Sequence, residues 1–287
     1  MMAQSVYPEK PNTLLKLFHK DKAIIGVIHS LPIPGSPQYH GEDLNEKAYD
    51  YAVSEAEAYV KGGVDGIIVE NAWDIPFLKP EDIGIETVAA MSVMVDRVRQ
   101  AVSVPIGVNC LANGAIQALA VAKATGVSFI RSNQWANAYI ANEGFVEGAA
   151  AKALRYRHNI GAEDVVVFAD VHVKHGSHSI VADRSVEEQT RDVEWFAADV
   201  LIATGNRTGH ATPLEEVQKI KSATNLPVIV GSGLSGENVE NLFTLADGAI
   251  VASSLKQGGV WWNPVNVDSV CRLMEIVNRI RSKAKPC

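Results

Sequence analysis

The sequence predicts a single (β/α)8 TIM barrel of the α/β class, preceded by an extra N-terminal helix. Eight short apolar runs, rich in β-branched residues, alternate with eight amphipathic segments of helical period. The runs are continuously apolar, which is typical of parallel strands that are covered on both faces. The repeats have similar sizes and no linker or low-complexity segment separates them, which favours a closed barrel over two domains.

The elements are expected in regular order along the chain. Strands are expected at 23–29, 65–71, 104–110, 127–133, 165–171, 199–205, 226–233 and 247–254. Helices are expected at 42–63, 85–102, 114–126, 145–159, 185–197, 213–224, 235–246 and 265–284. A further helix at about 12–20 would plug the bottom of the barrel. The chain is therefore expected to form one domain, with an extension and helix at 1–22, the barrel at 23–265, and the last helix and tail at 266–287.

Composition excludes several classes of protein. The net charge of −7 argues against non-specific binding of nucleic acid. The three cysteines form no C-x-x-C pair, so neither a disulfide framework nor a zinc knuckle is indicated. No apolar run reaches the ~18 residues that a membrane span needs, and the N-terminus lacks a secretory segment. We expect a soluble, cytoplasmic protein with a small-molecule partner; a homo-oligomer remains open.

Candidate catalytic residues follow the expected strands, because TIM-barrel active sites lie at the carboxyl ends of the strands. The fifth strand is followed by several ionisable residues, and alternation would place Asp170, His172 and Lys174 on one side with Phe168 below them. A lysine whose pKa is lowered by burial can transfer protons or form a Schiff base. The candidates for catalysis are Asp170, Lys174, Glu70, His29 and His175. The alternative is an exposed, salt-bridged loop.

Other polar residues at the same strand ends are candidates for orienting substrate hydroxyls. They are Asn71, Asn109, Arg131, Asn133, His172, Thr204, Arg207 and Thr208.

The seventh and eighth strand ends predict a phosphate site, which many TIM barrels build from these two loops. Glycines let the backbone approach a ligand closely, and the segment "LSGENVENLF" would begin a helix that favours an anion. The candidates are Gly231, Ser232, Gly233, Ser253 and Ser254. The ligand could instead be a carboxylate or sulfate, or the segment could be only a tight turn.

No cofactor is expected. His29, Glu70 and Asp170 could together bind a divalent metal, but the sequence has neither an H-x-H on the first strand nor an H-E-x-x-H.

Several segments resemble the BtpA/SgcQ family of barrel proteins over nearly the whole chain. They include "IIGVIHSLPIPGSPQY", "GGVDGIIVEN", "FIRSN", "LRYR", "FADVHVKH", "TGNRTG", "PVIVGSG" and "GAIVASSLK". The resemblance implies a (β/α)8 barrel and no particular reaction. One branch of the family is associated with photosystem I accumulation as a membrane-peripheral factor, and another with sugar uptake and sugar phosphates.

The chain departs from this family after the third strand. Where "GVNVLRND" would be expected, it has "GVNCLANG", so Ala112 and Gly114 replace an arginine and an aspartate. Ser132 also interrupts the usual "FIRVN". These differences imply a different substrate or a weaker activity.

Three functional hypotheses follow. The leading one is an isomerase or lyase that acts on a phosphorylated sugar or nucleoside-like compound, with proton transfer by Lys174, Asp170 and Glu70. The second is a glycosidic-bond hydrolase that uses Glu70 and Asp170. The third is a non-catalytic assembly or regulatory protein.

Overall fold

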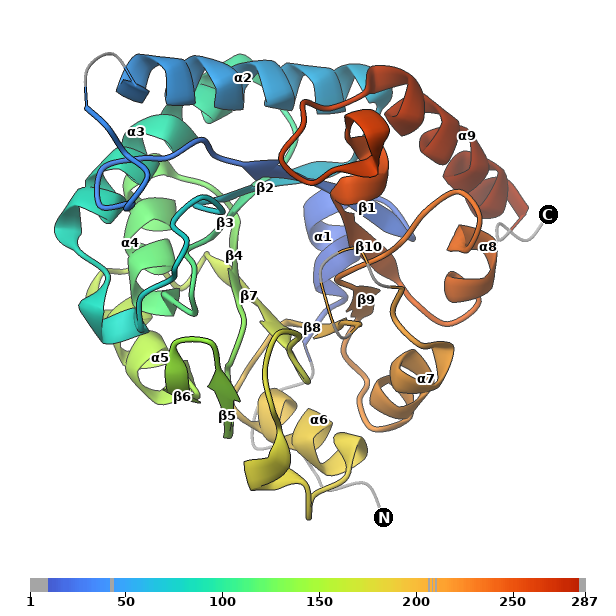
Figure 1. Cartoon of the computed structure of the whole chain (residues 1–287). Helices are drawn as coiled ribbons and strands as arrows, with labels where there is room; N and C mark the ends of the chain where they lie inside the picture. Colours follow the sequence, from blue (N-terminus) through green and yellow to red (C-terminus); the bar gives the residue numbers. More distant parts are fainter. Residues whose placement is uncertain (1–9, 42–43, 206, 208, 210, 284–287) are drawn as a thin grey trace.

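Eight parallel strands close into a barrel in the computed structural model, which describes residues 10–41, 44–205, 207, 209 and 211–283. Around the ring the strands run β1 (Ala23–His29), β10 (Gly248–Val251), β9 (Val228–Val230), β8 (Val200–Ala203), β7 (Val166–Asp170), β4 (Phe129–Ser132), β3 (Ile106–Asn109) and β2 (Gly66–Glu70). Helices surround this ring (Figure 1). The predicted TIM barrel is confirmed.

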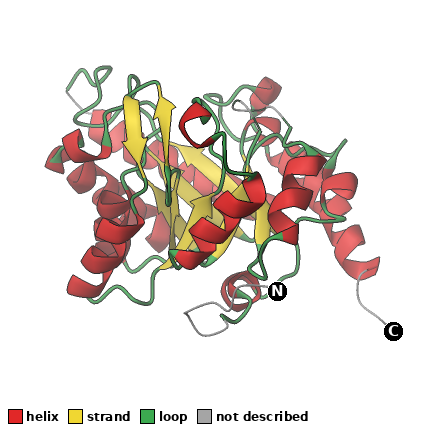
Figure 2. Cartoon of the chain, turned by 90° about the horizontal axis from the view of Figure 1, so that it is seen from below, coloured by secondary structure: helices red, strands yellow, loops and turns green. Residues whose placement is uncertain are grey.

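The helices that cover the strands lie at α2 (Leu44–Gly62), α3 (Ile85–Ala101), α4 (Ala115–Thr125), α5 (Ala150–Asn159), α6 (Val186–Trp195), α7 (Leu214–Ser222), α8 (Val239–Leu242) and α9 (Val267–Lys283). Short 3-10 turns lie at η1 (Pro80–Asp82), η2 (Ser179–Val181), η3 (Ser253–Leu255) and η4 (Gln257–Gly259). Figure 2 shows the strands lying between the helices. Within the described residues, none of the helices combines the length and apolar character needed to cross a bilayer.

The N-terminal helix α1 (Thr13–Phe18) closes the bottom of the barrel. Its Leu14 and Phe18 are buried in the same cluster as the inward side chains of the strands. The Phe18 ring meets Phe129 and Phe168 edge-on, with centroids 5.9 and 6.5 Å apart, and these two rings stack at 4.5 Å. The predicted plug is therefore present, and Phe168 points into the barrel as expected.

Two predicted helices were wrong in extent. The segment 145–159 is helical only from Ala150, because its first residues form β6 (Gly144–Glu147), which pairs antiparallel with β5 (Ala138–Ala141). The segment 235–246 contains only the four-residue α8. This helix is too short to offer a binding site at its N-terminus, so that argument for a phosphate site is lost.

The first and last long helices meet closely where the barrel closes. A Cβ added to Gly62 at the end of α2 would clash with Cβ and Cγ1 of Val270 in α9. We expect Gly62→Ala to destabilise the fold by about 1–3 kcal/mol through overpacking. Urea denaturation would measure this. The double variant with Val270→Gly, which removes both clashing atoms, should lose less stability than the sum of the two single changes. Additive losses would contradict this account.

Candidate active site

A cavity of about 850 Å³ opens at the carboxyl ends of the strands. This volume lies in the usual range of small-molecule sites. The predicted residues that line it are His29, Glu70, Asn109, Arg131, Asn133, Lys174, His175, Arg207, Gly231, Ser232, Gly233, Ser253 and Ser254. Thr208 lies outside the described residues.

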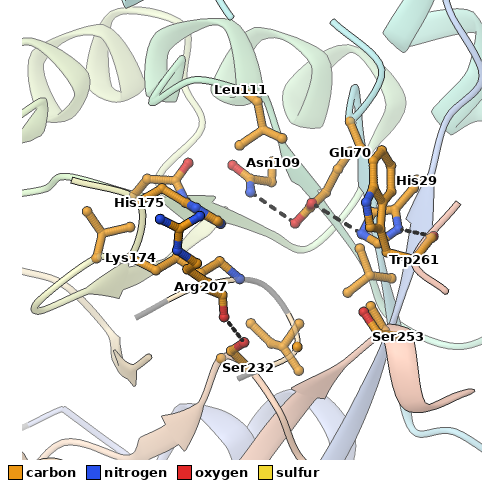
Figure 3. Close-up of a pocket in the computed structure, with 18 of the residues that line it drawn as sticks. His29, Glu70, Asn109, Leu111, Lys174, His175, Arg207, Ser232, Ser253 and Trp261 are labelled. Carbon is orange, nitrogen blue, oxygen red and sulfur yellow. Dashed lines mark hydrogen bonds and ion pairs between the residues drawn. The ribbon is translucent and has the colours of Figure 1, made fainter. Parts of the chain in front are cut away.

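Strand register places three of these residues in one row. His29 pairs with Glu70 across β1 and β2, and Glu70 pairs with Asn109 across β2 and β3. Nδ2 of Asn109 donates to Oε1 of Glu70 at 3.0 Å. The row forms one wall of the cavity (Figure 3).

The hydrogen bonds of His29 fix its tautomer. Nδ1 lies 2.8 Å from the carbonyl oxygen of Trp261, which can only accept, so Nδ1 carries hydrogen. Burial lowers the pKa of His29 to about 4, although the nearby Glu70 opposes this shift. The ring is therefore neutral at pH 7, and Nε2 presents a bare lone pair. Nε2 lies 3.9 Å from Oε2 of Glu70.

Arg131 lies below this wall and joins two carboxylates. Its Nη2 lies 3.0 Å from Oδ2 of Asp170, and its Nη1 lies 3.6 Å from Oε1 of Glu70. The Asp170 side chain is fully buried and does not line the cavity. Burial raises the pKa of Asp170, and Arg131 and Asn133 oppose that rise. Asp170 therefore holds Arg131 in place and does not reach a ligand, unlike the catalytic placement predicted from sequence.

Lys174 lies on the other side of the cavity from Glu70 and His29, close to Arg207 (Figure 3). The lysine is partly buried. Loss of hydration lowers the pKa of its amine to about 8; Arg131 adds to this shift, and Glu70 and Asp170 oppose it. A lysine with such a pKa has a substantial neutral fraction near neutral pH and can accept a proton.

Two residues that line the cavity have a buried amide oxygen without a partner in the described part of the chain. Asn109 and Asn133 each turn Nδ2 toward a carboxylate, at 3.0 Å from Glu70 and 3.4 Å from Asp170. Each Oδ1 therefore points elsewhere, and neither has a hydrogen-bond donor in the described part of the chain. The two side chains are 1% and 8% exposed. Buried acceptors of this kind suit ligand hydroxyl groups.

Three predicted substrate-binding residues lie away from this cavity. Asn71 is fully buried and bridges two loops: it donates to Asp74 and Leu111 and accepts from Leu111. His172 contacts Glu216 at 3.2 Å beside a second hollow of about 600 Å³, which Thr204 also lines. The expectation that His172 shares a side with Asp170 fails because β7 ends at Asp170 and alternation ends with it.

The loops after β9 and β10 offer unpaired backbone donors. Within the described chain, no acceptor takes the N–H groups of Ser232, Gly233, Leu234, Ser253 or Ser254. Gly233 has a φ of +68°, a conformation that favours glycine. By contrast, the Ser232 and Ser254 hydroxyls donate to Arg207 O and Leu234 O, and a Cβ on Gly231 would clash with Ile202. Main-chain groups, more than these hydroxyls, thus suit an anion here.

One wall of the cavity was not predicted from the sequence. Tyr139, Asn142 and Glu143 line it from the β5–β6 hairpin. The signal for this hairpin was the turn "NEG" between two short apolar runs, with Gly144 at a φ of +101°. Ala112, at one of the positions where the chain departs from the family pattern, also lines the cavity.

The predicted donor set for a metal is not assembled. His29 and Glu70 face each other, but Asp170 is engaged by Arg131 below them. Among the described residues, no three His, Cys, Asp or Glu side chains converge in a way that could hold a metal ion.

Comparisons with known proteins agree with this architecture. An uncharacterized protein from Archaeoglobus fulgidus is 40% identical over 84% of this chain and 94% of its own length. The photosystem I biogenesis protein BtpA from Synechocystis is 38% identical over 86% of this chain and 84% of its own. A chain of Mycobacterium tuberculosis tryptophan synthase superposes with a TM-score of 0.57 at 16% identity, covering 97% of this chain and all of the other. Residues 20–279 match the model of the BtpA family, and this chain belongs to that family.

Proposed function

We propose that this chain is a TIM-barrel enzyme that moves a proton on a phosphorylated, hydroxyl-bearing small molecule. The observation that carries the proposal is the pair formed by Glu70 at the end of β2 and Lys174 in the loop after β7, which line one cavity. The pKa of Lys174 is lowered to about 8, so its neutral amine can act as a base near physiological pH. Perturbed ionisable groups that share a cavity favour catalysis over simple packing.

The unpaired acceptors support a substrate with hydroxyl groups. Oδ1 of Asn109 and Oδ1 of Asn133 belong to residues that line the cavity, are buried and lack a protein donor among the described residues. A sugar or the ribose of a nucleoside-like compound would supply hydroxyls that donate to them. A purely apolar ligand would leave these oxygens unsatisfied at a cost of about 1–3 kcal/mol each.

The opposite region supports an anionic group on the same substrate. The free N–H groups after β9 and β10 lie with Arg207 and Lys174 around the cavity. Phosphate accepts several hydrogen bonds at once and suits such a set of donors. Isomerisation of a sugar phosphate needs a base beside a carbonyl, which the neutral amine of Lys174 would provide. In carbon–carbon cleavage the same amine would instead attack the substrate carbonyl and form a Schiff base with loss of water.

The alternative of glycoside hydrolysis by Glu70 and Asp170 loses support from this geometry. That reaction needs two carboxyl groups that flank the scissile bond. Asp170 does not line the cavity, and Arg131 and Asn133 engage its carboxylate.

One observation favours a non-catalytic assembly role: the Synechocystis relative is named a photosystem I biogenesis protein. Thermal-shift screening separates the two functions. An enzyme of the proposed type should be stabilised by particular phosphate esters, by about 2.7 kcal/mol at 100 times the dissociation constant. It should also turn over at least one of them. An absence of any shift across sugar and nucleoside phosphates would favour the assembly role.

The phosphate end can be tested by placing a charge next to the free N–H groups. We expect Ser253→Asp to weaken binding of phosphate esters at least about tenfold, because the new carboxylate repels the anion and competes for its donors. Isothermal titration would measure the change. Ser282→Asp on the exposed face of α9 is the matched control and should bind as the wild type does. Equal affinities for the wild type and both variants would mean that the phosphate binds elsewhere.

A further inference from the structure

The wall formed by His29 and Glu70 poses a specific hydrogen-bonding problem. Nε2 of His29 and Oε2 of Glu70 are both acceptors at neutral pH, and they face each other at 3.9 Å. That separation is too long for a hydrogen bond between them. Within the described chain, neither atom has a hydrogen-bond donor.

A single atom can satisfy both acceptors if it donates two hydrogens. An atom about 2.9 Å from each acceptor fits into a gap of 3.9 Å. A hydroxyl group has one hydrogen and can serve only one acceptor, whereas water and an amine each have enough for both. An ammonium also brings a positive charge, which the Glu70 carboxylate attracts. Asn109 lies next to Glu70 in the same row and adds a further unpaired acceptor.

We infer that the substrate carries a primary amino group, bound as an ammonium between Nε2 of His29 and Oε2 of Glu70, at the end of the molecule away from its phosphate. This inference rests on the proposed function, because it adds a feature to the same ligand. The substrate class is then a phosphorylated amine or amino sugar.

The charges around the cavity agree with an ammonium at this place. Glu70 and Asp170 face two cations, the guanidinium of Arg131 and the protonated amine of Lys174, so these four groups together are neutral. With an ammonium beside Glu70, the set stays neutral when Lys174 loses its proton. The added positive charge would favour that loss, because the pKa of Lys174 is already lowered to about 8. Binding of the amine would thereby prepare the base.

The test compares matched pairs of phosphate esters by isothermal titration. Glucosamine 6-phosphate and glucose 6-phosphate form one pair, and phosphoethanolamine and ethylene glycol monophosphate form a smaller one. We expect the amine of at least one pair to bind about tenfold tighter than the alcohol, because hydrogen bonds to charged groups are the stronger kind. Glu70→Gln should abolish this preference. Glu57→Gln, which changes an exposed carboxylate on α2, is the control and should keep it.

The outcomes separate this inference from the proposed function. If the alcohols bind as well as the amines, the inference is overturned and a phosphorylated hydroxyl compound remains. If no phosphate ester binds, both are overturned. If binding appears only with added Mg²⁺ or Zn²⁺ and is lost with EDTA, a cation bridges the two acceptors and the inference fails. Should Glu70→Gln not fold, His29→Asn tests the same preference.

Discussion

Replacement of Lys174 by methionine should lower turnover by about 10²- to 10⁴-fold, the usual contribution of a general acid or base. Methionine keeps much of the length of the side chain and removes the amine. The lysine lies at the cavity wall, outside the hydrophobic core of the barrel, so stability should change little. Steady-state kinetics with the best substrate from the phosphate-ester screen would measure the loss. Lys123→Met, on the outer helix α4, should retain full activity.

The pH dependence of the rate distinguishes Lys174 as a base from Lys174 as an acid. If Lys174 is the base, only its neutral form is active, and the pKa of about 8 makes the rate rise with pH through 8 and level off above it. Lys174→Arg keeps a positive charge, but arginine does not lose its proton in this range, so this variant should stay inactive at every pH. A rate that falls through pH 8 would instead assign Lys174 as the acid. Wild-type activity in Lys174→Met would remove it from the mechanism.

The sequence predicted the barrel well because its strands are buried on both faces and therefore read as continuous apolar runs. It also placed His29, Glu70 and Asn109 at neighbouring strand ends. Because these strands are adjacent and parallel, their register aligns the three residues in one row. Local patterns were sufficient here because each residue is fixed by its own strand.

The predictions failed where tertiary contacts decide the structure. The helix predicted at 145–159 was extended to Phe145, but this residue pairs with Ile140 in a hairpin at the barrel rim. Asp170 and His172 were expected to lie on one side of the chain. In the structure Asp170 forms an ion pair with Arg131 of the neighbouring strand β4, and His172 contacts Glu216. An ion pair between residues 39 positions apart cannot be predicted from a local sequence pattern.

A second large effect is expected at a buried ion pair behind the proposed phosphate loop. Lys256 follows η3 directly and contacts Glu55 of α2, and each of these residues is 2% exposed. Oε1 of Glu55 also accepts the backbone N–H of Val265. The Lys256 amine lies 5.5 Å from the centre of the Tyr59 ring. The pair thus anchors the loop that carries Ser253 and Ser254 to the outer layer of the barrel.

Lys256→Met should destabilise the fold by about 3–5 kcal/mol, because it leaves the Glu55 carboxylate buried without its cation. Urea denaturation at pH 7 would measure this loss. Lys221→Met, which removes a partner of Asp247 from a half-exposed ion pair, is the control and should cost about 1 kcal/mol or less. A loss below that of the control would show that the buried pair contributes nothing to stability.

The double variant Lys256→Met/Glu55→Gln should recover much of the loss, since glutamine still accepts from Val265 and no charge remains buried. A deficit that the double variant does not relieve would mean that Lys256 acts through the shape of its side chain and not through its charge.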